Sequence, residues 1–489
     1  MNKVLFTSSY FYKLDSKQWR FKQPYPPLGT LLAASVIRNQ GFNISLFDSS
    51  LKDNPHEISK LLNQESPRFL VIYDDGFNYL TKMCLTVMRE ASFTMAEEGK
   101  RNGCTVIISS SDASDHYEKY FSHGVDYVIR GEGEETLKEL LQILERKEDP
   151  LTIQGIAFNT SGVTKVTPPR SVIRDLDSLP LPAWDLIDME AYRHLWIKHH
   201  GYFSLNLATT RGCPFKCNWC AKPIYGNRYN SRTAFQVVNE IELLLKNHKP
   251  DHFWMSDDIF GLKPGWVKNF RDEVKKRGLT FRYKIQSRVD LLLEEDAITA
   301  LAESGAETVW VGAESGSQKI LDAMDKGTTV KQIREARLLL KQKGIKAAFF
   351  LQFGYPGETK EDIAATLQMV LNLMPDEIGI SVSYPLPGTK FYENVKAGLH
   401  EKQNWSDSDD LAMMFAGTYS SAYYKILHRY IHNRYRIQRG INQVKDWIKQ
   451  PGIPMALDLK RIASMVFHFP LALINAFQLH QLRKANGNN

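Results

Sequence analysis

Short apolar runs alternate with amphipathic helical patterns through the first 150 residues of the chain. The apolar runs have the length and composition of buried strands, and five are expected at Val4–Ser8, Asn43–Asp48, Phe69–Tyr73, Thr105–Ser109 and Asp126–Ile129. Helical patterns lie between them at Gly29–Asn39, His56–Leu62, Tyr79–Gly99, His116–Phe121 and Glu134–Leu144. This alternation predicts a doubly wound, Rossmann-like (flavodoxin-like) α/β domain over residues 1–150. Such a sheet binds ligands beyond the carboxyl ends of its strands.

The pattern changes between residues 151 and 200, where prolines are frequent and helical periodicity is weak. Pro168, Pro169, Pro180 and Pro182 each restrict the backbone around them. We therefore expect residues 151–200 to be an extended linker with little helix.

A second alternation of strands and helices follows over residues 201–395. Strands are expected at Ser204–Thr209, His252–Met255, Arg282–Gln286, Thr308–Gly312, Ala347–Phe353 and Glu377–Ser383. Helices are expected at Ala234–Asn247, Pro264–Arg277, Glu294–Glu303, Val330–Lys343 and Lys360–Leu373. About six βα units predict a partial (β/α)6 barrel of the TIM type, short of the eight units in a complete barrel.

Residues 396–489 are expected to form a mostly helical, basic C-terminal region. Residues 421–489 hold eleven Lys and Arg but two Asp and Glu, a net charge of +9, whereas the rest of the chain sums to −2. Because the positive charge is local, no nucleic acid partner is expected.

One stretch of this region, Ile462–Gln481, contains no Asp, Glu, Lys or Arg. His468, Pro470, Asn475 and His480 interrupt it, so a clean transmembrane helix is not expected. Two alternatives stay open: peripheral contact with a membrane surface, or packing against the body of the protein.

Three of the five cysteines lie within eight residues, in the loop after the first strand of the second alternation: Cys213, Cys217 and Cys220. Three thiolates can hold three irons of a 4Fe–4S cluster and leave the fourth iron open. Zinc is the alternative, but a structural zinc site takes a fourth protein ligand. His199 and His200 lie upstream of the loop, at no standard zinc-ligand spacing.

The other cysteines, Cys84 and Cys104, are isolated in the sequence. The five together therefore predict metal binding in a reducing compartment, and not a disulfide framework. Residues 1–6 run straight into a strand and lack the apolar core of a signal peptide. We expect a cytoplasmic protein, with association to a membrane surface as the open extension.

The cysteine loop resembles that of the radical S-adenosylmethionine (SAM) superfamily. The spacing C-x3-C-x2-C is the family's signature, and Trp219 supplies the aromatic residue that precedes the last cysteine. The resemblance implies that SAM binds the open iron and is cleaved reductively to a 5′-deoxyadenosyl radical, which abstracts a hydrogen atom. It also implies a reductant such as flavodoxin or ferredoxin.

The resemblance continues at the carboxyl ends of the later barrel strands. It implies contacts to the SAM amino group, carboxylate, ribose and adenine from Asp257, Asp258, Ser287, Arg288, Glu314, Gly354 and Pro385. Structural alternatives stay open for several of them: a polar turn at the two aspartates, a surface salt bridge at Arg288, and helix capping at Glu358 and Thr359. No general acid or base is assigned.

Residues 1–200 resemble the cobalamin-binding domain that precedes many radical SAM barrels. The positions that carry this resemblance follow the strands, and we expect cobalamin contacts from Leu28, Gly29, Asp75, Gly76, Gly131 and Glu132. The Asp-x-His-x-x-Gly sequence that supplies a cobalt-ligating histidine in cobalamin mutases is absent. The resemblance therefore implies cobalamin without that ligand, and a domain that serves only as a lid is the alternative.

The resemblance implies methylation of an unactivated carbon in a small-molecule substrate. The uncharged run Ile462–Gln481 suggests that this substrate is a lipid or isoprenoid. A radical cyclase or rearrangement enzyme, of the anaerobic magnesium-protoporphyrin cyclase type, is an alternative that the sequence does not separate from it. A non-catalytic cobalamin or iron–sulfur sensor is a third.

Overall fold

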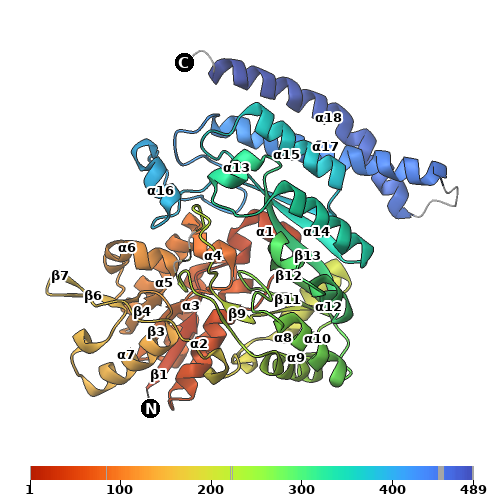
Figure 1. The fold of residues 1–489 in the computed structure, drawn as a ribbon. Coiled ribbons are helices and arrows are strands. Elements are labelled where there is room, and N and C mark those ends of the chain that lie inside the picture. Colours follow the sequence, from red (N-terminus) through yellow and green to blue (C-terminus); the bar gives the residue numbers. More distant parts are fainter. Residues whose placement is uncertain (1, 84, 221, 223, 450–455, 487–489) are drawn as a thin grey trace.

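The computed structural model describes residues 2–83, 85–220, 222, 224–449 and 456–486 (Figure 1). A mostly parallel sheet and a fully parallel sheet, each with its helices, form the body, and two long helices cover one edge of it. This arrangement confirms the α/β fold class that the sequence predicts.

The N-terminal sheet has seven strands in the order β2-β1-β3-β4-β5-β6-β7. Its strands are β1 Lys3–Thr7, β2 Asn43–Phe47, β3 Phe69–Tyr73, β4 Thr105–Ser109, β5 Tyr127–Ile129, β6 Ile156–Thr160 and β7 Val163–Val166. The first five are parallel, and the chain changes direction across the sheet between β1 and β3. A crevice at such a switch point is where sheets of this kind bind ligands.

Helices cover both faces of this sheet (Figure 1). They are α1 Ser16–Phe21, α2 Leu28–Arg38, α3 Ile58–Glu65, α4 Tyr79–Met83, α5 Thr86–Arg101, α6 Ser111–Phe121 and α7 Glu134–Arg146. The single helix predicted over Tyr79–Gly99 is two helices, because Leu85 is extended and the N–H of Thr86 donates to the Trp405 carbonyl, 2.9 Å away. Cys84, in the middle of that prediction, lies outside the described residues.

The expectation of an extended segment over residues 151–200 is wrong in part. Strands β6 and β7 form an antiparallel hairpin on the edge of the sheet, and helix α8 spans Met189–His200. The hairpin is hard to recognise because β7 is largely exposed, so its sequence lacks a buried apolar run. The boundaries of the domains stay a prediction.

The second sheet has six parallel strands in the order β15-β14-β13-β12-β11-β8, which is the reverse of their order in the chain. They are β8 Ser204–Leu207, β11 His252–Met255, β12 Arg282–Ser287, β13 Ala306–Glu314, β14 Lys346–Phe353 and β15 Glu377–Val382. Consecutive parallel strands with helices between them form the predicted partial barrel.

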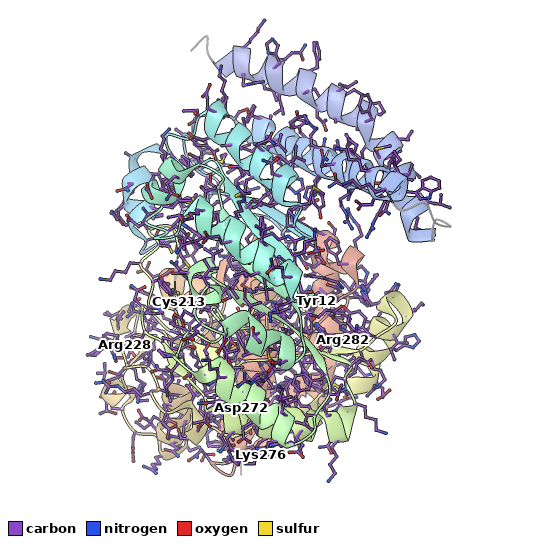
Figure 2. The ribbon with its side chains drawn as sticks, turned by 45° about the vertical axis from the view of Figure 1, so that its right-hand side comes forward. Tyr12, Cys213, Arg228, Asp272, Lys276 and Arg282 are labelled. Carbon is purple, nitrogen blue, oxygen red and sulfur yellow. The ribbon has the colours of Figure 1, made fainter. Side chains whose placement is uncertain are left out.

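The barrel helices are α9 Ala234–His248, α10 Trp266–Lys276, α11 Val289–Leu292, α12 Ala297–Glu303, α13 Gln318–Ala323, α14 Val330–Gln342 and α15 Lys360–Leu373. A short pair of strands, β9 Thr210–Arg211 and β10 Asn230–Ser231, brackets the cysteine loop. Cys213 lies away from Asp272 and Lys276, which mark the surface of α10 (Figure 2).

Side chains of the N-terminal domain pack directly against the barrel. The Tyr25 hydroxyl lies 3.1 Å from the Ser204 hydroxyl, and the Asn206 amide donates to the Pro26 carbonyl over 3.0 Å. Buried aromatic residues from both domains belong to one hydrophobic core. The carboxyl edge of the first sheet is therefore held against the barrel.

Helix α16 Lys390–Val395 follows the last barrel strand, and in the described part of the C-terminal region lie the long helices α17 Ser421–Lys449 and α18 Ala456–Asn486. Helix α17 lies on the barrel, where the Tyr435 hydroxyl donates to the Pro375 carbonyl over 2.6 Å. Helix α18 lies outside α17, on the outer edge of the molecule (Figure 1). The predicted helical region is confirmed as part of the fold.

Candidate functional site

The cysteine loop leaves the barrel at the end of β8 and turns at Gly212. This glycine has a φ of +77°, and a Cβ atom there would lie 2.2 Å from the Arg228 carbonyl oxygen. Glycine alone has both the freedom to adopt that φ and the space to pass the carbonyl. Cys213, the first cysteine of the loop, follows directly and is buried.

Asp257 fixes the start of the loop. Its carboxylate accepts hydrogen bonds from the Thr209 and Thr210 N–H groups and from the Thr209 hydroxyl, each 2.7 Å long. Burial raises the pKa of Asp257 to about 6, although these donors oppose the shift. Both oxygens are engaged inside the protein, so the direct role of Asp257 is to anchor the loop, and its predicted contact with SAM stays a prediction.

Arg211 ties the same end of the loop to the N-terminal domain. Its guanidinium donates to Glu132 and, over 2.7 and 3.2 Å, to both oxygens of Glu134. All three side chains are almost fully buried. The guanidinium also lies over the rings of Tyr225 and Phe77, 5.2 and 5.7 Å from their centroids. A buried, paired arginine therefore holds the strand that leads into the cysteines.

Asn218 fixes the far end of the loop. Its amide nitrogen donates to the Ala323 carbonyl over 2.7 Å, and its backbone N–H donates to the Met324 carbonyl over 3.0 Å. The Tyr355 hydroxyl donates to the Asn218 side-chain oxygen over 3.0 Å. Sequence reasoning missed Asn218, because an asparagine between two cysteines carries no signal of its own.

The thiols themselves fit a cluster better than a single ion. Among the described residues, no three His, Cys, Asp or Glu side chains are close enough to hold one metal ion together. A 4Fe–4S cluster takes each thiolate on a separate iron. Burial raises the pKa of Cys220 to about 12, with the Asp258 carboxylate adding to the shift. Iron would supply the positive charge that a buried thiolate needs.

Asp258 and Arg288 flank this loop. Asp258 is partly exposed and pairs with Lys82 from α4 of the N-terminal domain. Arg288 lies with one guanidinium nitrogen 3.8 Å from the Cys217 sulfur, stacks over Phe215 and pairs with Asp290. Arg288 is thus buried beside the cysteines and not on the surface, while Ser287 next to it is also buried.

Glu314 lies close to the loop in a strained backbone conformation. Its φ of +56° is uncommon for a residue with a side chain, and the register between β13 and β14 shifts there. Its carboxylate accepts a hydrogen bond of 2.8 Å from Lys326, whose ammonium group is 5.9 Å from the centre of the Trp219 ring. Burial opposes the charge of Lys326, but Glu314 and Cys217 outweigh it and raise its pKa. Sequence reasoning missed Lys326.

Gly354 has a φ of +78° and faces the C-terminal region. Its Cβ position would lie 3.0 Å from the Met413 sulfur and 3.2 Å from the Tyr424 ring. Its N–H donates to one oxygen of the fully buried Glu358 over 2.7 Å. Within the described chain, the other Glu358 oxygen and the Tyr424 hydroxyl have no hydrogen-bond partner. The space predicted for adenine is therefore bordered by the C-terminal region.

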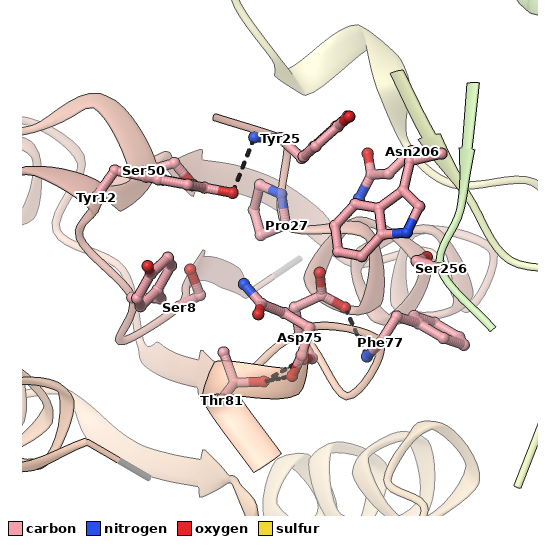
Figure 3. A pocket seen from close by; sticks show the side chains of 13 residues that line it. Ser8, Tyr12, Tyr25, Pro27, Ser50, Asp75, Phe77, Thr81, Asn206 and Ser256 are labelled. Carbon is pink, nitrogen blue, oxygen red and sulfur yellow. Dashed lines mark hydrogen bonds between the residues drawn. The ribbon is translucent and has the colours of Figure 1, made fainter. Parts of the chain in front are cut away.

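A cavity lies at the switch point of the N-terminal sheet, where it meets the barrel (Figure 3). Tyr12, Asp75, Phe77 and Asn206 are among its lining residues. The Asn206 side-chain oxygen is buried without a hydrogen-bond partner among the described residues. An orphaned acceptor in a polar and aromatic cavity is expected where a ligand binds.

The residues predicted for cobalamin gather at this edge. The Asp75 carboxylate accepts from the N–H groups of Gly29 and Phe77, as Figure 3 shows in part. Burial raises the pKa of Asp75 to about 6. A Cβ atom at Gly76 would lie 3.0 Å from the Tyr225 hydroxyl. Leu28 lines the next cavity, Gly131 faces the Ile224 carbonyl, and Glu132 holds Arg211.

Another cavity lies where α4 and α6 of the N-terminal domain face the segment that follows β15. Pro385 lines it together with Lys82, Asp112 and His116. Hydroxyl, amide and backbone groups lie at this seam between the N-terminal domain and the barrel. They can form hydrogen bonds with the amide groups at the edge of a corrinoid.

Three comparisons place this geometry among known proteins. Residues 207–370 match the model of the radical SAM superfamily. An uncharacterized methyltransferase of Pyrococcus horikoshii is 28% identical over 387 residues, which are 78% of this chain and 81% of the relative. The anaerobic magnesium-protoporphyrin IX monomethyl ester cyclase of Rubrivivax gelatinosus is 29% identical over 276 residues, or 55% of this chain and 49% of the cyclase.

A solved structure covers nearly the whole chain. The cobalamin-dependent SAM radical enzyme OxsB, with aqua-cobalamin bound, superposes with a TM-score of 0.74 over 98% of this chain and 72% of its own. The sequence identity is 16%, so the likeness is one of fold.

Proposed function

We propose that this chain, whose residues 207–370 form a radical SAM domain, is a cobalamin-dependent radical SAM enzyme that methylates an unactivated carbon of a small-molecule substrate. One observation carries the proposal: the anchored cysteine loop and the carboxyl edge of the N-terminal sheet meet at one seam, linked by Arg211 and Glu134. Two cofactors bound on either side of that seam would face each other across the substrate.

The chain's own residues would hold the iron–sulfur cofactor. Cys213, Cys217 and Cys220 are the ligands that the loop offers. When bound, the cluster supplies the electron that cleaves SAM to a 5′-deoxyadenosyl radical, and cobalamin supplies a methyl carrier. Arg288 and Lys326 place two positive charges beside the loop, where they suit an anionic carboxylate.

The N-terminal domain would hold the corrinoid through the residues that gather at its carboxyl edge. Asp75 lines the cavity at the switch point and Leu28 lines the one beside it, while Gly29 donates its N–H to Asp75 and Gly76 follows Asp75 in the chain. Gly131 presents backbone to the same seam, whereas Glu132 acts through Arg211. Phe77 and Tyr225, whose ring centroids are 5.8 Å apart, close the seam and would separate on cofactor entry.

A radical cyclase is the second candidate. The similarity to the magnesium-protoporphyrin cyclase favours it, although the matched part is about half of that enzyme. Both functions use the same radical SAM domain, so only the product separates them. A gain of one methylene unit in the product supports methyl transfer, and an unchanged carbon count supports cyclisation or rearrangement.

A lipid or isoprenoid is the substrate class that we favour within small molecules. Its support is the apolar outer surface of α18, from Val466 to Phe477. The reductant would be a small electron carrier such as flavodoxin or ferredoxin, since reductive SAM cleavage needs one electron from outside the chain.

The experiment uses anaerobically purified, cluster-reconstituted protein with added hydroxocobalamin. After desalting, the visible spectrum reports bound corrinoid, and 5′-deoxyadenosine is measured after adding SAM and dithionite. Retained cobalamin together with 5′-deoxyadenosine supports the proposal. Cys217→Ala should abolish 5′-deoxyadenosine, while Cys104→Ala, at a buried cysteine far along the chain from the loop, should leave it unchanged.

Two outcomes would contradict the proposal. No 5′-deoxyadenosine from iron-loaded protein would remove the radical SAM activity. Loss of all cobalamin on desalting, with 5′-deoxyadenosine still formed, would remove methyl transfer through cobalamin and leave the N-terminal domain as a lid.

A further inference from the structure

Helix α18 turns its polar side chains inward. A narrow stripe faces α17 and is buried: His468, Ala472, Asn475 and Leu479. His468 lies 2.8 Å from the Asn433 side-chain oxygen, and the Asn433 amide donates to Asn475 over 2.9 Å. Two of the four buried positions are therefore polar and satisfied by α17.

The opposite side of α18 is apolar and exposed. Among the described side chains of α18, seven large apolar ones are more than half exposed: Leu459, Val466, Phe467, Phe469, Leu473, Ile474 and Phe477. A surface helix of a soluble protein normally has its apolar stripe inside and its polar face outside. Helix α18 has the reverse arrangement, which is expected where the surrounding medium is lipid.

The close packing of α17 and α18 fixes this orientation. Gly440 of α17 has no side chain, and a Cβ atom there would lie 2.4 Å from the Met465 Cβ. One guanidinium nitrogen of Arg436 also lies 2.9 Å from Nε2 of His468. Because these contacts use the polar stripe, rotating the apolar side inward would leave buried polar groups unpaired.

The charged residues of α18 favour an anionic lipid surface. Lys460 and Arg461 lie at one end of the apolar side, Arg483 and Lys484 lie at the other, and no Asp or Glu occurs between them. The two basic ends are about 35 Å apart at 1.5 Å per residue. This pattern, a wide apolar side between basic groups, suits the interface of an anionic bilayer.

Length alone would also allow a span. The segment Leu459–Lys484 is long and apolar enough to cross a bilayer by length and composition, with 22% of it buried. However, α17 lies against it and carries Arg429, Arg434 and Arg439. Spanning would draw these charges into hydrocarbon, whereas a helix lying flat keeps them in water.

We propose that α18 docks the protein on the surface of an anionic membrane, lying in the plane of the interface with Phe467, Ile474 and Phe477 inserted. Helix α17, which rests on the barrel through Tyr435, then holds the barrel directly above the lipid. The occupant of the apolar side is a lipid surface with negative headgroups. The inference stands apart from the proposed function, since it needs neither cofactor.

The test uses the full-length, iron-loaded protein and sedimentation with vesicles of phosphatidylcholine alone or with one third phosphatidylglycerol. We expect binding to the anionic vesicles to be at least tenfold stronger and to weaken with added salt. The double variant Phe467→Asp/Phe477→Asp should lower binding more than tenfold. Phe235→Asp is the matched control, because Phe235 is an exposed phenylalanine on α9.

Three results would overturn the proposal. One is the absence of binding by the intact protein to either vesicle. Another is equal binding by the aspartate variant of α18 and its control. The third is that the intact protein binds no vesicles and forms a dimer in sedimentation velocity, while the α18 variant is a monomer. The apolar side of α18 would then be an interface between two copies of the chain. Unchanged circular dichroism and 5′-deoxyadenosine formation show that the variants are folded, and they keep this test separate from that of the proposed function.

Discussion

Replacing Arg211 should destabilise the protein more than replacing either carboxylate that it binds. Arg211 carries one positive charge between Glu132 and Glu134, and all three side chains are buried. Arg211→Met leaves two carboxylates without a cation in a low-dielectric site. Breaking a buried ion pair in this way costs about 3–5 kcal/mol.

Glu132→Gln gives the matched comparison. It leaves the pair between Arg211 and Glu134, which is joined through both carboxylate oxygens, intact. Burial, with Glu134 nearby, raises the pKa of Glu132, so a negative charge on Glu132 is costly at this site. We expect the loss of one charge-assisted hydrogen bond to cost about 1.5–3 kcal/mol, which is less than the arginine variant loses.

The measurement is urea unfolding followed by tryptophan fluorescence, with iron per protein determined after reconstitution. Arg211→Met should unfold at lower urea and bind less iron, because Arg211 lies two residues before Cys213. The triple variant with Glu132→Gln and Glu134→Gln removes all three charges and should recover part of the stability. If Arg211→Met loses under about 1 kcal/mol and keeps its iron, the reasoning that this cluster of charges fixes the loop is refuted.

Three further predictions concern the rest of the site. Burial raises the pKa of Glu358 to about 8 from 4.5, so folding takes up a proton between these pH values. The free energy of unfolding should therefore fall with rising pH, by up to about 1.4 kcal/mol per pH unit. Urea unfolding from pH 4.5 to 8 should show that Glu358→Gln removes this slope. Gly212→Ala places a Cβ atom 2.2 Å from a carbonyl oxygen, whereas Gly226→Ala, also at positive φ, meets open space. The Gly212 variant should therefore bind less iron after reconstitution, and the Gly226 variant should keep its iron. Lys326→Met leaves Glu314 buried and unpaired and should cost about 3–5 kcal/mol by urea unfolding, and a pair variant that also carries Glu314→Gln should regain most of it.

Most of the strands could be predicted because their sequences carry a local signal. Phe69–Tyr73 and His252–Met255 are short apolar runs followed by polar residues, and the structure has β3 and β11 with these bounds. The hairpin of β6 and β7 gave no such signal, since its outer strand is exposed. Local pattern reports burial, so an exposed edge strand is missed.

In the candidate site too, some residues could be predicted from a local signal and others could not. Arg288 follows its strand in sequence, so the resemblance could point to it, and the structure places it beside Cys217. Lys326 lies far along the chain from Cys217 and shares no motif with it, yet it reaches the same loop through Glu314. The contact of Asp257 with SAM stays a prediction, whereas its hydrogen bonds to Thr209 and Thr210, which anchor the loop, are visible only in the structure.

The sequence by itself determined the chemistry that the chain can offer: three thiols at a fixed spacing, the order of strands and helices, and an uncharged run between basic residues. Each of these is a property of neighbouring residues, and short-range periodicity or spacing is enough to reveal it. Only the tertiary structure decided which charges meet. Glu134 and Arg211 are 77 residues apart, and they pair because the first sheet packs its carboxyl edge against the barrel. Tertiary structure also decided the orientation of α18, which its composition does not determine. Helix α17 forms hydrogen bonds with the polar stripe of α18, so the apolar side of α18 faces the solvent.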